Sequence, residues 1–301
     1  FTGSLTLPKN LTSIEWDAFL GCSGLTSVTI PESVKEIGGG AFSNCSNLSS
    51  IIVDGNTDYD SVDNVLFNKD HTTLLSYPAG KKDTSYVVPE SVKSIGACAF
   101  MGADLSSLAL PQNLTSIGWS AFETCRNLTS MTIPDSVTSI GFAAFRFCSS
   151  LTSVTIPWQV TQIEEQTFRD CANLKDVYYT GGQARWTRIE ILDGNEPLIN
   201  ATIHFGPTGT AGAGDCGDSL TWSVDTDGTL TISGTGAMWD YDVIDEELRT
   251  TAPWYSYSPV KLVLNEGVTQ IGSWAFYNID FAGSLTLPES LTSIGNGAFL
   301  N

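Results

Sequence analysis

The sequence predicts an α/β-type repeat fold that is mostly β: a solenoid with a parallel sheet on its inner face, built as two solenoid units joined by a short linker. Two observations carry this prediction. The 23-residue stretch from Pro134 to Ile156 matches itself again and again along the chain. A Phe marks the same place in its copies, at positions 19, 42, 100, 122, 145, 168, 276 and 299. Such a period indicates a solenoid, in which each repeat buries its apolar side only by stacking on its neighbours.

The apolar positions within one copy predict how a coil folds. Residues 151–156 have the spacing L-x-x-V-x-I, which is typical of a short parallel strand. Pro157 ends that strand, because proline offers no N–H to a neighbouring strand. Residues 137–140 predict a second, shorter extended segment. The apolar residues within 144–148 predict a helical or 3₁₀ corner between the two strands.

The full pattern of one copy is P-x-S-V-T-S-I-G-x-x-A-F-x-x-C-x-x-L-T-S-V-T-I. It resembles the BspA-like leucine-rich repeat of bacterial cell-surface proteins, over about residues 1–205 and 260–301. The resemblance implies a leucine-rich-repeat solenoid at the bacterial cell surface, where such proteins adhere to proteins of a host or of neighbouring cells.

The first solenoid unit is predicted to occupy residues 1–205. The repeats are interrupted at 53–85, where two apolar runs separated by the polar NKDHTT predict a hairpin that stands off the solenoid. Residues 177–205 differ in character from the repeats, and we assign them as the C-terminal cap. A helix over 183–191 and a last strand over 201–205 would cover the final apolar layer.

Residues 206–214 carry no charge and no large side chain, which predicts a flexible linker. The segment 215–301 then predicts the start of a second leucine-rich-repeat unit. Its first part, up to 259, alternates apolar and polar residues around Asp227-Gly228, as an N-terminal β-hairpin cap would. Because the sequence begins and ends inside repeats, we expect uncapped apolar ends and weak head-to-tail self-association through them.

The net charge of the chain argues against two classes of binding partner. The chain has 14 Lys and Arg against 33 Asp and Glu, a formal net charge of −19. Nucleic acids and anionic membrane surfaces would repel such a protein. No stretch approaches the ~18–20 consecutive apolar residues that span a bilayer. We therefore expect no nucleic-acid partner and no membrane span in this sequence.

The cysteines follow the repeat instead of forming a disulfide framework. Five of the seven fall three residues after the repeated Phe, and Cys216 stands outside this set. Equivalent positions in adjacent coils stack ~4.8 Å apart with parallel Cβ vectors, which is poor geometry for a disulfide. The pattern predicts a buried ladder of free thiols. Its members are Cys22, Cys45, Cys125, Cys148 and Cys171.

No residue is assigned a catalytic role, and no cofactor is expected. The two histidines, His71 and His204, lie in no catalytic motif. The spacing D-x-N-x-D-x-D at 54–60 is similar to the start of a calcium loop. However, Tyr59 stands where such a loop needs Gly, and Val65 stands where it needs Glu. A polar turn is the favoured alternative, so no metal site is assigned.

Two surfaces are candidates for binding. The outward positions of the inner sheet are mostly Ser and Thr, which suit strand pairing more than selective recognition. This series ends at Tyr178, which has a large aromatic side chain. The corner before the repeated A-F varies instead, from Gly39 to Trp119 and Phe142. Large aromatic side chains at such positions either anchor an interface or cover the edge of their own coil. The candidate binding residues are Trp119, Phe142, Phe147 and Tyr178.

Three functions are compatible with these features. The first is a non-enzymatic, extracellular protein-binding or adhesion module of a bacterial surface protein, with host or neighbouring-cell surface proteins or glycans as partners. The second is a structural spacer in a cell-wall protein. The third is a scaffold attached to an enzyme outside this sequence. The resemblance favours the first.

Overall fold

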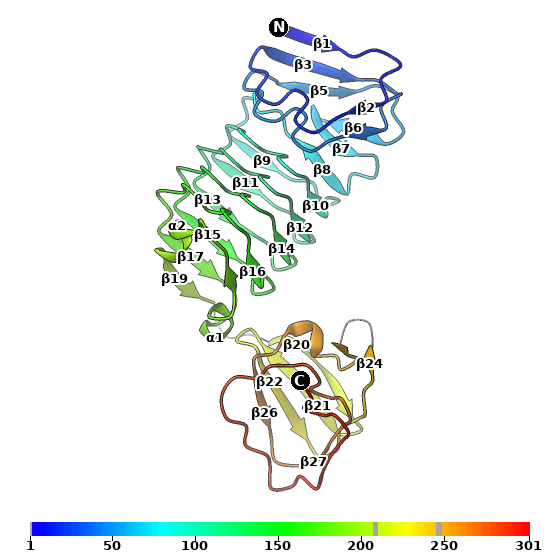
Figure 1. The fold of residues 1–301 in the computed structure, drawn as a ribbon, viewed down its shortest axis with the longest axis vertical. Coiled ribbons are helices and arrows are strands. Elements are labelled where there is room, and N and C mark those ends of the chain that lie inside the picture. Colours follow the sequence, from blue (N-terminus) through cyan, green and yellow to red (C-terminus); the bar gives the residue numbers. More distant parts are fainter. Residues whose placement is uncertain (1, 207–209, 245–248) are drawn as a thin grey trace. The chain divides into compact units, whose positions relative to one another are not determined.

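The computed structural model describes residues 2–206, 210–244 and 249–301. Contacts within the chain divide it into two compact units (Figure 1). The first unit consists of Phe1–Tyr179 and Ile189–His204, and the second of Thr180–Arg188 and Phe205–Asn301.

The inner sheet of the first unit contains one strand from each coil, because the L-x-x-V-x-I spacing places Val and Ile on the buried side. Val28, Val154 and Ile156 are almost completely buried there. Its strands form three hydrogen-bonded groups, β1-β3-β5, β9-β11 and β13-β15-β17-β19. They are β1 (Gly3–Thr6), β3 (Leu25–Ile30), β5 (Ser50–Val53), β9 (Ser85–Val87), β11 (Ser107–Ala109), β13 (Ser130–Thr132), β15 (Ser153–Ile156), β17 (Asp176–Tyr179) and β19 (Thr202–Phe205).

A second row of strands lies on another side of the same coils (Figure 1). Each of these strands is two residues long and contains one Ile. Ile95 and Ile140 are examples, and both lie in the core. The row forms three hydrogen-bonded groups, and neighbours within a group pair in parallel, for example Ile117 with Ile140. The row consists of β2 (Ser13–Ile14), β4 (Glu36–Ile37), β10 (Ser94–Ile95), β12 (Ser116–Ile117), β14 (Ser139–Ile140), β16 (Gln162–Ile163) and β18 (Glu190–Ile191).

The predicted helical or 3₁₀ corner is wrong: the corner is a series of hydrogen-bonded turns. Backbone donors of the corner bond to the next coil, as when the Phe145 N–H donates to the Thr167 carbonyl at 2.9 Å. These donors are therefore not free for a helix. Two positions of these coils, two residues before and two residues after the repeated Phe, adopt left-handed backbone. A right-handed α-helix cannot contain such residues. The non-glycine examples in these coils are Asp17, Cys98, Ser120, Ala143 and Gln166 at the first place, and Asn44, Thr124, Phe147 and Asp170 at the second.

The core of the corner is a stack of the repeated Phe rings. Phe145 lies with its ring centroid 5.1 Å from that of Phe122 and 5.4 Å from that of Phe168. The thiols lie beside this stack, and Cys148 donates to the Phe122 carbonyl at 3.1 Å. All seven cysteines are free, and desolvation by burial raises the pKa of Cys125 to about 12. The predicted ladder of free thiols is confirmed, with four of its members buried and Cys22 half-buried.

The insertion forms three antiparallel strands, β6 (Tyr59–Val62), β7 (Val65–Asn68) and β8 (Thr73–Ser76). They do not stand off the solenoid as predicted, because β8 pairs in parallel with β10 and extends the second row. Val65 and Leu66 are completely buried. The apolar face of the hairpin therefore belongs to the solenoid core.

The predicted cap helix over 183–191 is also wrong. Helix α1 covers only Gln183–Trp186, because Glu190 and Ile191 form β18 and pair with β16. A second short helix, α2, covers Glu196–Ile199 just before β19. Chain contacts group α1 with the second unit, so β18, α2 and β19 close the first unit.

The side chain of Asn195 completes the hydrogen bonds of the last coil. In the regular coils, the N–H of the repeated Phe donates to a carbonyl of the next coil. At the last coil, the Phe168 N–H donates to Asn195 Oδ1 at 2.9 Å instead. Asn195 Nδ2 donates to the carbonyls of Glu164 and Leu192, both at 2.8 Å. This buried amide therefore stands in for the missing next coil.

Replacing Asn195 with Ala is expected to lower the free energy of unfolding by about 2–3 kcal/mol, because each buried group that loses its partner costs about 1 kcal/mol or more. Urea denaturation measures this change. Asn173→Ala is the matched control, since its exposed amide donates to the Ser149 carbonyl from the surface of the coil. Equal midpoints for the two variants would contradict the role assigned to Asn195.

The second unit begins with three antiparallel strands, joined in parallel by a fourth. These are β20 (Thr210–Gly217), β21 (Leu220–Asp225), β22 (Thr229–Gly234) and β26 (Lys261–Leu264). The remaining elements are β23 (Gly236–Ala237), β24 (Val243–Ile244), β25 (Arg249–Thr250), the 3₁₀ helix η1 (Tyr255–Tyr257), β27 (Val268–Ile271) and β28 (Ser293–Ile294). Trp254 is fully buried in the core of this unit, and its indole N–H donates to the Ala275 carbonyl at 2.9 Å.

The linker predicted at 206–214 is wrong for residues 210–214, which form the first part of β20. Residues 207–209 lie outside the described residues. The glycines of this stretch serve close packing: a Cβ at Gly212 would clash with the ring of Tyr257, and one at Gly214 would lie 2.9 Å from Trp222 Nε1. Sequence composition alone does not distinguish such a strand from a flexible linker.

Candidate binding site

One corner of the first unit exposes a row of aromatic side chains. We define the aromatic row as the equivalent positions of five coils: Trp16, Gly39, Ala97, Trp119 and Phe142. Trp16 is 58% exposed, Trp119 37% and Phe142 40%. The Trp16 and Trp119 rings stack with their centroids 5.6 Å apart and their planes inclined by 25°.

The insertion does not separate the coils at this corner. The Asn44 N–H donates to the Met101 carbonyl at 3.1 Å, and the Ser43 hydroxyl donates to the Cys98 carbonyl at 2.8 Å. The coils on either side of the insertion are therefore direct neighbours here. This bypass brings Trp16 to Trp119, although 103 positions separate them in the sequence.

Small residues form the floor under Trp16. A Cβ at Gly39 would clash with the Trp16 ring and would lie 2.9 Å from the Cβ of Ala97. The ring can lie across two coils only because both carry little or no side chain. The aromatic side chains thus cover the edges of neighbouring coils, and each still leaves more than a third of its surface in solvent.

A pocket of about 200 Å³ opens beside Trp16. Its walls are apolar, with Leu66 and Leu75 from the insertion and Ala97 from the next coil. The segment from Gly38 to Ala41 also lines it. A volume of this size accommodates one side chain of a partner, the usual arrangement at the energetic centre of a protein interface.

The four predicted binding residues do not form one site. Trp119 and Phe142 lie in neighbouring coils of the aromatic row. Phe147 is half-buried on the same corner, with the guanidinium carbon of Arg146 4.6 Å from the centre of its ring. Tyr178 belongs to β17 of the inner sheet, where it is 47% exposed.

Tyr178 lies in a small polar cluster at the end of the inner sheet. Its ring stacks on His204 with the centroids 4.7 Å apart. His204 Nε2 lies 2.7 Å from Asp176 Oδ1, so the imidazole is paired with a carboxylate. The stacking and the pairing both hold the Tyr178 ring in place on β17.

Phe147 has an unfavourable backbone conformation, with φ at 60°. Left-handed backbone costs a bulky residue about 1–2 kcal/mol, and Asn tolerates it better. Phe147→Asn is therefore expected to raise the free energy of unfolding by up to ~1 kcal/mol, after the loss of ring contacts is subtracted. Thermal unfolding measures the change, with Asp170→Gly as a control for the equivalent place in the next coil. A destabilised Phe147→Asn protein would show that ring packing outweighs the strain.

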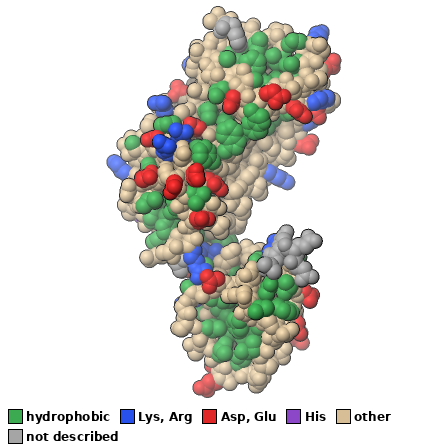
Figure 2. Space-filling view, in the orientation of Figure 1, with side chains coloured by type: hydrophobic (Ala, Val, Ile, Leu, Met, Phe, Trp, Pro, Cys, Tyr) green, Lys and Arg blue, Asp and Glu red, His purple; other side chains and the backbone are tan. Residues whose placement is uncertain are grey.

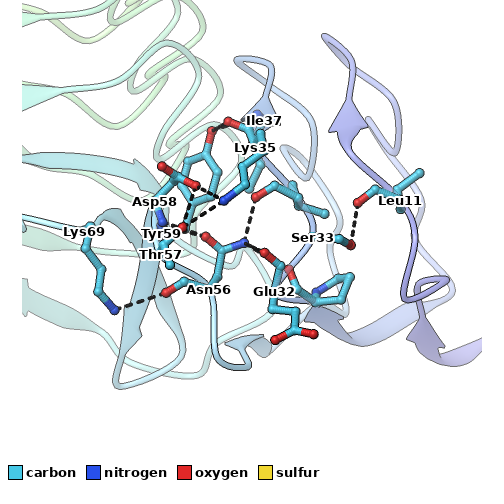
Figure 3. Close-up of polar contacts among 12 residues, drawn as sticks. Leu11, Glu32, Ser33, Lys35, Ile37, Asn56, Thr57, Asp58, Tyr59 and Lys69 are labelled. Atoms are coloured by element: carbon cyan, nitrogen blue, oxygen red, sulfur yellow. Dashed lines mark hydrogen bonds and ion pairs between the residues drawn. The ribbon is translucent and has the colours of Figure 1, made fainter.

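Asn56 and Asp58, two of the residues with calcium-loop spacing, are held by other protein groups (Figure 3). Asn56 is buried, and its Nδ2 donates to the carbonyls of Pro31 at 2.9 Å and Val34 at 2.7 Å. Asp58 pairs with Lys35 Nζ at 2.7 Å, and the hydrogen bond from Lys35 lowers the pKa of the Asp58 carboxyl. Within the described ranges, no three His, Cys, Asp or Glu side chains form a group that could hold a metal ion.

Asp60, the last residue of that spacing, pairs with His71 Nε2 at 2.9 Å. The hydrogen bond from His71 is the main cause of a lowered pKa at the Asp60 carboxyl. Asp58 and Asp60 thus bind partners in different segments, and the buried Asn56 amide fastens the start of the insertion to the preceding coil.

Sequence reasoning missed the contact between Trp16 and Trp119, and it missed the pocket. The available signal was the pair of small residues, Gly39 and Ala97, between the two Trp positions of the repeat.

In the part of the chain that the structure describes, no helix has the length and hydropathy needed to cross a membrane.

Comparison with known proteins gives a consistent result. The family model of the BspA type leucine rich repeat region matches the chain in 6 copies, at residues 2–80, 76–187 and 253–301. Among curated proteins, no sequence matches the chain. The structure of a leucine-rich repeat protein from Eubacterium ventriosum covers 99% of this chain and is matched over 64% of its own length, at 22% identity and a TM-score of 0.58. That match confirms the predicted leucine-rich-repeat solenoid with a parallel sheet.

Two further structures are similar over a smaller share of the chain. The pneumococcal vaccine antigen PcpA is matched over 66% of this chain and 60% of its own, at 24% identity and a TM-score of 0.49. A leucine rich cell surface protein from Faecalibacterium prausnitzii is matched over 63% of this chain and 62% of its own, at 26% identity and a TM-score of 0.45. The chain thus spans 60–64% of the length of these three proteins.

Proposed function

The chain belongs to the BspA-type leucine-rich repeat family, and from this premise we propose that it is a non-enzymatic protein-binding module of a bacterial surface protein. Leucine-rich-repeat domains generally mediate protein binding, and this family is typical of bacterial surface proteins. The proposal includes an extracellular location and adhesion to surface proteins or glycans of a host or of neighbouring cells.

The exposed aromatic row is the observation that carries this proposal. Trp16, Trp119 and Phe142 keep much of their surface in solvent although each lies beside a well-packed core. Aromatic side chains of this kind dominate the energetics of protein interfaces, above all next to a pocket. We assign Trp119 and Phe142 to the centre of the docking surface, with Phe147 beside them. Tyr178 would contribute a separate contact on the inner sheet.

A structural spacer is the second candidate function. Small, mostly uncharged side chains such as Ser130 and Thr132 cover much of the inner sheet. Ladders of this kind support strand pairing. On this alternative, the solenoid holds another part of the same protein away from the cell wall, or serves as the scaffold for an attached enzyme.

Binding to immobilised matrix proteins and to a glycan array separates these candidates. The double variant Trp119→Ala/Phe142→Ala is expected to lose at least about tenfold in affinity for any protein that the wild type binds at micromolar concentration. Its melting temperature should remain close to that of the wild type, because both rings are exposed. Trp239→Ala, at a 47% exposed position in the second unit, is the matched control. Unchanged affinity of the double variant would reject the assigned surface, and no binding by the wild type would favour the spacer.

A further inference from the structure

The charges around the aromatic row indicate what kind of partner it takes. We propose, resting on the docking surface proposed above, that the row binds an extended segment of a partner protein that carries Lys or Arg side chains. The proposal depends on the carboxylates at both ends of the row and on the pocket beside Trp16.

Carboxylates flank the row at both ends. Six coils contribute to this part of the corner, at residues 15–17, 38–40, 96–98, 118–120, 141–143 and 164–166. These positions include Glu15 and Asp17 at one end and Glu164 and Glu165 at the other, and no Lys or Arg. Glu15, Asp17 and Glu165 are exposed. Figure 2 shows hydrophobic side chains on the first unit with acidic side chains on either side of them, and with some Lys and Arg side chains among these.

Backbone contacts fix these carboxylates next to the aromatic side chains. The Ala143 N–H donates to the Glu165 carbonyl at 3.1 Å, so Glu165 follows the coil of Phe142 directly. At the other end, the Asp17 N–H donates to the Gly39 carbonyl at 3.3 Å. A Cβ at Gly40 would clash with Asp17 Oδ1, which places that oxygen against a residue that lines the pocket.

This arrangement suits a side chain with an apolar stem and a cationic head. The methylene groups of Lys or Arg would fill the apolar pocket while the charged group reaches the Asp17 carboxylate at its rim. Further cations would lie over the exposed Trp faces, where the aromatic quadrupole attracts them. The chain already shows such a contact, in which Arg146 lies over the ring of Phe147.

The row, together with the adjoining coil of Glu164 and Glu165, sets the length of the segment. Six coils stacked ~4.8 Å apart extend over roughly 24 Å, which an extended chain covers with about seven residues at ~3.4 Å each. The net charge of −19 adds long-range attraction for a basic partner and repels an acidic one. A neutral glycan could stack on the Trp rings but would gain nothing from the four carboxylates.

A peptide pair tests the charge requirement. The probe is a fluorescein-labelled Gly-Arg-Leu-Arg-Leu-Arg-Gly peptide, and its control carries citrulline, which has nearly the same shape and no charge, in place of each Arg. Fluorescence anisotropy with the full chain is expected to show at least about tenfold tighter binding of the Arg peptide in about 50 mM NaCl. That affinity should fall several-fold in about 300 mM NaCl, since salt screens exposed charges.

Matched variants locate the binding. Glu164→Gln/Glu165→Gln and, separately, Trp16→Ala should each weaken binding of the Arg peptide at least about fivefold. Asp54→Asn/Asp70→Asn removes the same number of charges from exposed positions of the insertion and should change the affinity less than about twofold. Circular dichroism confirms folding, and the Glu variants keep the test valid if Trp16→Ala does not fold.

Three results would overturn the proposal, of which the first two are equal affinity for the Arg and citrulline peptides, and equal losses in the Glu164/Glu165 and Asp54/Asp70 variants. The second result would mean attraction by net charge alone. Preferred binding of a neutral glycan through Trp16 and Trp119 would also overturn it. If Trp119→Ala/Phe142→Ala still abolishes binding to a partner protein in any of these cases, the docking surface stands and only the basic character of the partner is rejected.

Discussion

Replacing Phe145 with Ala is expected to lower the free energy of unfolding by about 3–5 kcal/mol, more than the loss of any exposed ring of the aromatic row. The Phe145 ring is completely buried and stacks between Phe122 and Phe168. Its loss leaves a cavity that faces two interfaces at once, and in a solenoid each coil is held only by its two neighbours. Urea denaturation followed by circular dichroism measures the change.

Phe142→Ala is the control for this prediction, because the exposed Phe142 belongs to the same coil. Its loss should cost less than about 1 kcal/mol. A broader unfolding transition for Phe145→Ala would show that the coils on either side of the cavity unfold separately. If Phe145→Ala and Phe142→Ala had equal stabilities, the stack of Phe rings would not be the core of the corner.

Replacing Asn56 with Ala is expected to lower the free energy of unfolding by about 3–4 kcal/mol, since each buried partner left unsatisfied costs about 1 kcal/mol or more. Asn56 Oδ1 accepts hydrogen bonds from the N–H groups of Asp58 at 2.8 Å and Tyr59 at 3.1 Å. Its amide N–H groups donate to carbonyls of the preceding coil. Urea denaturation measures the loss, and hydrogen exchange should become faster at the Asp58 and Tyr59 amides.

Asn47→Ala is the matched control for Asn56→Ala. Asn47 Nδ2 also donates to a carbonyl of the preceding coil, that of Ser23 at 2.7 Å, but from an exposed position. A loss below about 1 kcal/mol is expected there. Unchanged hydrogen exchange at the Asp58 and Tyr59 amides of Asn56→Ala would contradict the view that this side chain fastens the insertion.

The repeat pattern predicts the structural features that every coil shares. It does not predict features that arise where one element packs against a different element. The Phe and Cys positions follow from the period, because identical coils bring identical residues into contact. The corner sequence suits a helix, but the Phe145 N–H bonds to the next coil instead of to its own. The composition around Gly212 and Gly214 indicates a flexible segment, whereas Tyr257 and Trp222 pack directly against these glycines.

The repeat pattern also predicts part of the candidate site. Aligning the copies singles out Trp119 and Phe142, since other copies carry small residues at this position. The contact of Trp119 with Trp16 depends on the hydrogen bonds that bypass the insertion, and no local pattern encodes them. The pocket likewise needs Leu66 and Leu75, whose placement follows from the pairing of β7 with β8 and of β8 with β10.

The thiol ladder has a consequence for the conditions in which the solenoid folds. Burial raises the pKa of Cys45 to about 11 and that of Cys125 to about 12, so at neutral pH both stay protonated. The thiolate is the form that attacks oxidants and disulfides, and at neutral pH these two residues do not present it. The native fold therefore needs no oxidative step and has no cross-link to lose to a reductant. These buried thiols are compatible with a reducing cell interior and an oxidising medium outside, without any covalent change.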